Sequence, residues 1–264
     1  MQRALVLTTP LLLSYPDILK RPASDPAFVL PVQTLAKLKP ARDLYYLRRS
    51  IPDMAQYRLA HLLVKEWAKS RGLYAAKLGL LGGIHITAML VPICKLLTAA
   101  HNPLSTADIL ISFFYHYANF DWESNLVFDT HFHKDLRYRR AAREPLCLLG
   151  WHGPSLNTSS NASRPTVHTI SSEFKHASRL LSQGGMTWTG FLTRETAKLG
   201  VGPHTDAAGE FLLGYKSYVK VDARYWGSSQ SKGRRYFGWL ESRFVMLLVG
   251  ETPRMAHHVA VDFL

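Results

Sequence analysis

From Leu78 to Cys94 the chain runs for seventeen residues without a formally charged side chain. That length lies near the lower limit for a helix that crosses a bilayer. Gly82, Gly83 and Pro92 interrupt the stretch, which favours a helix buried in a protein core over a membrane span. We therefore expect a fold built around this segment, without a membrane partner.

The composition indicates a globular protein with a polyanionic partner. Of 264 residues, 47% are hydrophobic and 19% are charged, which is enough to bury a core. The 32 Lys and Arg exceed the 19 Asp and Glu, giving a formal net charge of +13. On charge alone this excess favours RNA or DNA as the partner, with an anionic membrane ranked second, and the interrupted apolar segment favours the nucleic acid. Cys94 and Cys147 have no CxxC spacing, which suits a reducing, intracellular compartment.

Periodic apolar residues predict helices on both sides of the uncharged segment. After Asp53, the residues Leu59, Leu63 and Trp67 recur every four positions, and Gly72 ends the pattern. This spacing predicts an amphipathic helix with these three side chains on its buried face. Further helices are predicted over residues 84–97, from about 106 to 122, near 168–183 and over 234–250.

The remaining segments are expected to be irregular or to form strands. Residues 1 to about 45 contain six prolines, which predicts strands and loops and no long helix. Residues 127–165 are polar and poorly periodic, and we expect loops there. Alternation over residues 215–226 predicts a strand before the helix at 234–250, and another strand is expected near 256–264. This order predicts a small α/β unit.

Five stretches together resemble one protein family. QYRLAHLLVKEWAKSRGLYAAKLGLLGGIHITAML, residues 56–90, is similar to the central-domain signature of the poly(A) polymerases, where FRL precedes IKLWAK, an aromatic residue and GFLGG. STADILISFFYHYANFDW and SSEFKHASRLL resemble two later helices of that domain. GYKSYVKV and RRYFGWLESRFVMLLVG resemble the strand and helix that open the family's RNA-binding domain.

The resemblance implies an α+β chain, with a mainly helical poly(A) polymerase-like central domain followed by a small, partial ferredoxin/RRM-like α/β unit. Residues 1–45 would be the remnant or edge of a nucleotidyltransferase domain, 46–200 the helical central domain, and 201–264 a partial RNA-binding-like domain. The implied function is RNA 3′-end adenylation from ATP, a step of mRNA processing. The implied location is nuclear, or otherwise intracellular.

The resemblance also implies a nucleotide-binding set. Lys65 would reach the ATP phosphates, Tyr74 would contact the ribose or base, and Gly83 with Ile84 would present backbone to the adenine. An ammonium neutralises phosphate charge, an aromatic ring offers a face, and glycine permits close approach. Ala76 stands where the family has Asn, and GGIHITAML is one residue longer than the family's GGVSWAML and lacks its Trp. Base recognition is therefore expected to differ.

The basic segment RYRRAAR, residues 137–143, is the candidate RNA contact. Arginines bind phosphates and an interleaved aromatic ring stacks on bases. A solvated basic face is the simpler alternative. The candidate RNA-binding residues are Arg137, Tyr138, Arg139, Arg140 and Arg143.

Catalytic residues are not found in this sequence. Nucleotidyl transfer needs two metal ions held by about three carboxylates, usually in an Asp-x-Asp pair after Gly-Ser. The chain contains no Asp-x-Asp, and its single Gly-Ser, at residues 227–228, lies in the wrong third of the sequence. Either a separate N-terminal portion supplies the catalytic carboxylates and their Mg²⁺ or Mn²⁺, or the protein is an inactive RNA-binding scaffold derived from a poly(A) polymerase.

A metal site in the segment DTHFHKD is a third possibility. Asp129, His131, His133 and Asp135 alternate along it, and alternating side chains on a strand would share one face. No distant fourth ligand is evident in the sequence. We favour a polar loop for this segment.

Overall fold

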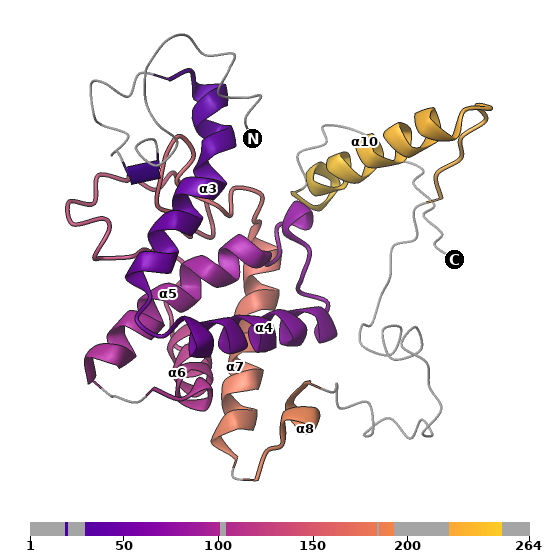
Figure 1. Cartoon of the computed structure of the whole chain (residues 1–264). Coiled ribbons are helices and arrows are strands. Elements are labelled where there is room, and N and C mark those ends of the chain that lie inside the picture. Colours follow the sequence, from indigo (N-terminus) through magenta and orange to yellow (C-terminus); the bar gives the residue numbers. More distant parts are fainter. Residues whose placement is uncertain (1–18, 21–29, 101–103, 184, 193–221, 250–264) are drawn as a thin grey trace, which may run out of the picture.

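The fold is mainly helical, as the computed structural model in Figure 1 shows. The model describes residues 19–20, 30–100, 104–183, 185–192 and 222–249. The helices named in these ranges are α3 (Val32–Ser50), α4 (Met54–Ser70), η1 (Ala76–Leu78), α5 (Gly83–Ala100), α6 (Thr106–Ala118), α7 (Arg164–Ser182), α8 (Trp188–Leu192) and α10 (Gln230–Val249). The helices predicted from periodicity are therefore confirmed.

Short polar side chains start the central helices. The Asp53 carboxylate accepts hydrogen bonds from the backbone N–H groups of Ala55 and Gln56, which starts α4. Ser105 and Asp108 form a reciprocal capping box at the start of α6. Gly72 follows α4 with a φ of 70°, a conformation that glycine adopts without strain. These local signals explain why the helix limits could be read from the sequence.

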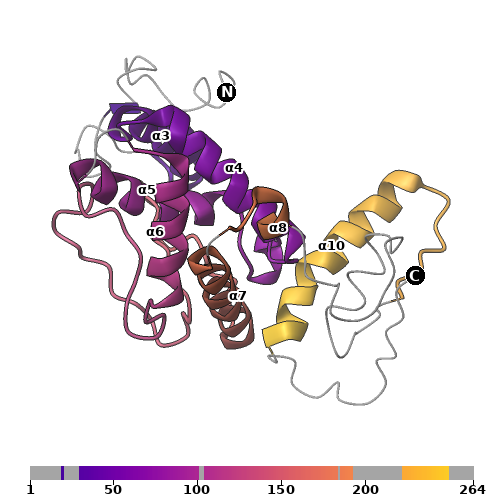
Figure 2. The ribbon, with the colours of Figure 1, turned by 90° about the horizontal axis from the view of Figure 1, so that it is seen from below.

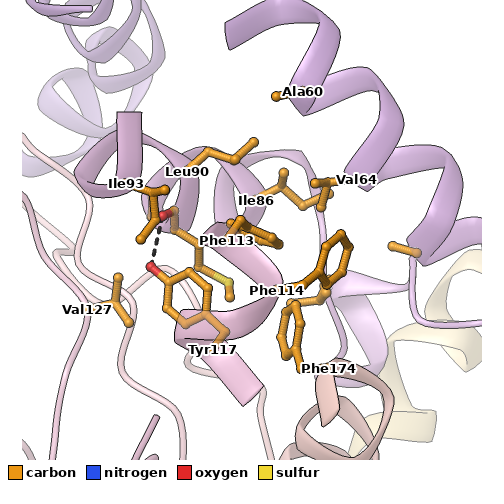
Figure 3. Close-up of a cluster of buried hydrophobic side chains, with 14 of the residues drawn as sticks. Ala60, Val64, Ile86, Leu90, Ile93, Phe113, Phe114, Tyr117, Val127 and Phe174 are labelled. Carbon is orange, nitrogen blue, oxygen red and sulfur yellow. Dashed lines mark hydrogen bonds between the residues drawn. The ribbon is translucent and has the colours of Figure 1, made fainter. Parts of the chain in front are cut away.

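An aromatic cluster holds α4, α6 and α7 together (Figure 3). The Trp67 ring of α4 stacks on Phe174 of α7, with 5.3 Å between ring centroids. The same ring meets Phe114 of α6 edge to face at 4.8 Å. The Tyr117 hydroxyl donates a hydrogen bond to the Met89 carbonyl at 2.8 Å, which joins α6 to α5. Aromatic contacts of this geometry add to the free energy gained from burial.

The uncharged segment supplies the core face of α5. Ile86, Met89, Leu90 and Val91 are fully buried, so the predicted core helix is confirmed. Within the described ranges, no helix is long and apolar enough to cross a membrane.

The predicted buried face of α4 is wrong for Leu59, which is 51% exposed. The buried side chains include Tyr57, Ala60, Val64 and Trp67, which lie three or four residues apart. A strict spacing of four drifts around a helix of 3.6 residues per turn, so Trp67 is fully buried, Leu63 is partly buried against the core and Leu59 is exposed.

The prediction of strands and loops before residue 45 is wrong for residues 32–45, which lie in α3 despite Pro40 inside the helix. Proline removes one backbone hydrogen bond. The helical turn next to Pro40 is stabilised by Lys39. Its Nζ donates to the Asp43 carboxylate one turn later, at 2.9 Å, and to the carbonyl of the distant residue His152, at 2.7 Å. Tertiary contacts thus outweigh local propensity here. Residues 1–18 and 21–29 lie outside the described residues.

Between α6 and α7 the chain forms the predicted loops. Residues 119–163 contain no helix, and two isolated β-bridges join Val127 to Leu148 and Leu149 to Asn157. This stretch, which we call the long loop, packs against α3 through His152 and against α5 through Asp129 and Thr158.

Helix α10 stands beside the helical body in both views and meets it at η1 (Figures 1 and 2). An exposed ion pair, Lys77 Nζ to Glu241 at 3.7 Å, spans this contact. Of the strand predicted over residues 215–226, the described residues 222–226 are irregular, and residues 215–221 lie outside the description. The strand expected near 256–264 also lies outside it.

Candidate nucleotide-binding site

Three of the predicted nucleotide residues converge from separate elements. Lys65 lies on α4, Tyr74 follows that helix, and Gly83 begins α5. The Lys65 ammonium lies 5.6 Å from the centroid of the Tyr74 ring. The Tyr74 hydroxyl lies 3.4 Å from the position that a Cβ would take at Gly83. Ile84, the fourth residue, is 39% exposed beside them.

The turn that carries Gly83 is packed too tightly for larger residues. A Cβ at Gly79, where φ is 77°, would lie 2.3 Å from the carbonyl oxygen of Asn161 in the long loop. A Cβ at Gly82 would lie 2.8 Å from the Ala76 Cβ. These glycines let η1, the start of α5 and the long loop approach one another closely.

The charge environment leaves Lys65 available to an anion. Its neighbour Glu66 pairs with Lys69 at 2.8 Å. Among the described residues, no carboxylate lies within ion-pair distance of Lys65. An unpaired ammonium beside an aromatic face is suited to a phosphate-bearing ligand.

His61 belongs to this site, although the sequence reasoning did not select it. Its Nε2 donates to the Gly83 carbonyl at 3.3 Å, and the Thr87 hydroxyl donates to the same oxygen at 2.9 Å. Burial lowers the pKa of His61, and the Lys65 charge adds to that lowering. The one signal in the sequence is that His61 precedes Lys65 by one helical turn.

His85 fixes the start of α5 from the other side. Its ring is buried, with Nε2 at 2.8 Å from the Thr158 carbonyl and Nδ1 at 3.2 Å from the Leu80 carbonyl. Burial lowers the pKa of this imidazole, and a neutral ring donates to one carbonyl only. We assign the N–H to Nε2, which makes the shorter contact.

In the basic segment, Arg140 holds the long loop together. Its guanidinium donates to the carbonyl oxygens of Trp122 at 2.8 Å, Glu123 at 2.7 Å, Asn125 at 2.9 Å and Glu144 at 2.7 Å. These bonds occupy all three of its nitrogens, so its geometry is that of a structural anchor.

The other four candidate RNA-binding residues differ in exposure. Arg137, Arg139 and Arg143 are exposed, whereas Tyr138 is partly buried. The Tyr138 hydroxyl donates to the Glu144 carboxylate at 2.7 Å. Burial and this carboxylate raise the pKa of Tyr138. The three exposed arginines therefore carry the solvent-facing charge of this segment.

Asp129 of the segment DTHFHKD is a buried anchor. Its Oδ2 accepts hydrogen bonds from Lys95 Nζ at 2.6 Å, Tyr46 at 3.0 Å and Trp151 Nε1 at 3.0 Å. Burial acts to raise the pKa of Asp129, but the bonds from Lys95 and Trp151 outweigh it and lower the pKa. The carboxylate thus neutralises a buried ammonium.

The other residues of that segment form no metal-binding group with Asp129 among the described residues, although His131 Nδ1 lies 3.8 Å from Asp129 Oδ1. The His133 Nε2 donates to the Gly150 carbonyl at 2.8 Å, and the side chain of His131 is 71% exposed. No group of three or more His, Cys, Asp or Glu that could hold a metal ion occurs in the part of the chain that the structure describes. The segment is a loop, as we favoured.

Comparisons with known proteins show which family the chain resembles. The family model described as the poly(A) polymerase central domain matches residues 56–193. The chain is 23% identical over 235 residues to a poly(A) polymerase of Dictyostelium discoideum, covering 84% of this chain and 26% of that protein. It is 23% identical over 226 residues to nuclear poly(A) polymerase 4 of Arabidopsis thaliana, covering 81% of this chain and 28% of that protein. The chain thus spans about a quarter of each relative's length.

Proposed function

Because this chain belongs to the poly(A) polymerase family, we propose that it forms the nucleotide-side wall of a protein that adds adenylates from ATP to RNA 3′ ends. The observation that carries this proposal is the convergence of Lys65, Tyr74 and Gly83 on one face. Each residue alone is common on protein surfaces. Their meeting from three separate elements supports contact with one shared ligand.

In this proposal the three groups divide the nucleotide between them. The Lys65 ammonium holds the phosphates, and the Tyr74 ring contacts the ribose or base. The Gly83–Ile84 backbone faces the adenine, with His61 holding the Gly83 carbonyl in place. Ala76 stands where the family has Asn, so the base would meet backbone atoms without that side chain. We therefore expect selectivity for adenine to be altered.

The RNA would contact the exposed part of the basic segment. Arg137, Arg139 and Arg143 are placed to meet phosphates, and Tyr138 and Arg140 support the loop that presents them. We further propose that α10 belongs to a small ferredoxin/RRM-like unit within residues 201–264, and that residues 46–200 are the central domain. The relatives named as nuclear enzymes make the nucleus the proposed location.

Metal-dependent chemistry is not assigned to the described residues. Mg²⁺ or Mn²⁺ finds no group of carboxylates among them. A catalytic portion would therefore have to supply the metal ligands and the nucleophile activation. This observation also favours a second candidate, an inactive RNA-binding scaffold that retains the nucleotide face or the basic segment alone.

ATP binding tests the proposal directly. We expect Lys65→Ala to weaken ATP binding by about tenfold, because it removes one charge-assisted contact to phosphate. Lys69→Ala is the matched control, since Lys69 lies one turn further along α4 and is paired with Glu66. Isothermal titration of the 264-residue chain measures both. Equal affinities in the two variants would contradict the proposed site.

RNA binding separates the two candidates. The scaffold candidate predicts binding of oligo(A) without binding of ATP. Its affinity for oligo(A) should fall as the salt concentration rises, and also when Arg137, Arg139 and Arg143 are replaced. A chain that binds ATP through Lys65 and extends an oligo(A) primer in Mg²⁺ or Mn²⁺ is an enzyme. Primer extension would also show that the missing Asp-x-Asp pair is not required.

A further inference from the structure

A cleft of about 970 Å³ lies between α3 and the long loop, and none of the proposed nucleotide- or RNA-binding residues lines it. The side chains that matter for its chemistry are Tyr45, Arg49, Ser50, Phe132, Trp151 and His152. Its volume lies at the upper end of the range, about 300 to 1,000 Å³, that is usual for small-molecule sites.

The described lining of this cleft is basic. Lys20 and Arg49 line it, and no Asp or Glu does among the described residues. The Arg49 guanidinium contacts the Tyr45 hydroxyl at 3.0 Å and has no described carboxylate within ion-pair distance. The nearby Asp43 carboxylate is taken by Lys39 and by His152 Nδ1, at 2.9 and 2.8 Å. The cleft therefore favours an anion.

The walls of the cleft also suit a flat ring. Tyr45, Phe132 and Trp151 line it together, with the Phe132 ring braced edge to face against Tyr46 at 4.8 Å. Ser50 also lines the cleft, and its hydroxyl oxygen is buried without a hydrogen-bond partner among the described residues. Buried hydroxyls are usually satisfied, so this one is available to a polar ligand atom.

We propose that this cleft binds a phosphorylated nucleoside, with the phosphate on Arg49 and the base against the aromatic wall. The two available sources are a free nucleotide and a residue of an RNA chain, which present the same chemistry. Aromatic walls with an arginine are a common arrangement for such groups. The site is separate from the Lys65 face and does not depend on the function proposed for that face.

A titration in the Lys65→Ala background isolates this cleft. ADP without added metal is titrated into the 264-residue chain carrying Lys65→Ala, alone and combined with Arg49→Ala or Arg48→Ala. Arg48 is the matched control, because it is exposed on the same helix turn but does not line the cleft. We expect Arg49→Ala to weaken ADP binding about tenfold and Arg48→Ala by less than about twofold. Adenosine should be less sensitive to Arg49→Ala, since it carries no phosphate.

An oligo(A) arm distinguishes the two sources. If oligo(A) binding falls with Arg49→Ala and not with Arg48→Ala while ADP does not bind, the ligand is an RNA residue. If ADP responds in that way, a free nucleotide occupies the cleft. Equal responses of the Arg48 and Arg49 variants to both ligands, or no binding of either ligand by the Lys65→Ala chain, would overturn the proposal.

Discussion

The proposed nucleotide face, formed by Lys65, Tyr74 and Gly83, and the long loop use charged residues in opposite ways. On the nucleotide face, Lys65 is left without a described carboxylate and the backbone is shaped by glycines close in sequence. In the long loop, Arg140 and Asp129 are saturated by partners and hold the chain in place. A charged side chain whose hydrogen bonds are all made inside the protein is a poor candidate for ligand contact.

The difference teaches how to read basic segments in an irregular region. RYRRAAR looks uniform in the sequence, yet one of its arginines is an anchor and three are exposed. A loop without helix or sheet must satisfy its carbonyls by other means, and a guanidinium with five N–H groups does this efficiently. Mutations can therefore distinguish the arginine that stabilises the loop from the arginines that are proposed to contact RNA.

The largest expected effect is on Asp129. Asp129→Ala removes the partner of Lys95, whose side chain is 8% exposed, and leaves a buried ammonium unpaired. We expect a loss of about 4 kcal/mol in the free energy of unfolding. Urea unfolding followed by circular dichroism measures it. The control is Asp135→Ala in the same segment, where the side chain is exposed and a change below about 0.5 kcal/mol is expected.

Arg140 should follow Asp129 in size. Arg140→Ala leaves four loop carbonyls without their donor, and we expect about 3 kcal/mol of destabilisation. Arg139→Ala is the neighbouring control, expected to change stability by less than about 0.5 kcal/mol while weakening RNA binding. If the two variants unfolded at the same urea concentration, the anchor and contact roles would not be distinct.

Glycine substitution beside the proposed nucleotide face should also change the free energy of unfolding. Gly79→Ala forces a Cβ against the Asn161 carbonyl and keeps an unfavourable positive φ, so we expect about 2 kcal/mol of destabilisation. Gly238→Ala, in α10 with no atom within 4 Å of the new Cβ, should be neutral or slightly stabilising. Thermal unfolding of both variants is the measurement. A neutral Gly79→Ala would mean that the turn relaxes without cost.

The limits of the central helices and the candidate nucleotide residues could be predicted from the sequence, because both depend on signals between residues that lie close together in the chain. The limits of α4 and α6 follow from capping residues and apolar periodicity, and Lys65, Tyr74 and Gly83 stand in a recognisable order. Helix α3 was missed because distant contacts, such as Lys39 with the His152 carbonyl, override Pro40. The roles of His61 and Arg140 were missed because their partners are backbone carbonyls. Every residue has a backbone carbonyl, so the sequence does not show which of them a side chain will bind.

The smallest expected effect lies where the two regions touch, at His85. Its ring bridges the glycine turn and the long loop, and burial holds its pKa below the ordinary 6.5. Between the lowered folded pKa and 6.5 the unfolded chain binds more protons, so unfolding becomes easier as the pH falls below about 6.5. Above that pH the contribution is complete. The native chain should therefore lose stability between about pH 7 and pH 5.5, and His85→Gln should lose less stability over that interval. Urea midpoints at the two pH values measure this, with the exposed His131→Gln as control.

If His85→Gln kept the native pH dependence in full, protonation of His85 would not be its cause. Another group whose pKa is lowered by burial, such as His61, would then account for the loss of stability at low pH.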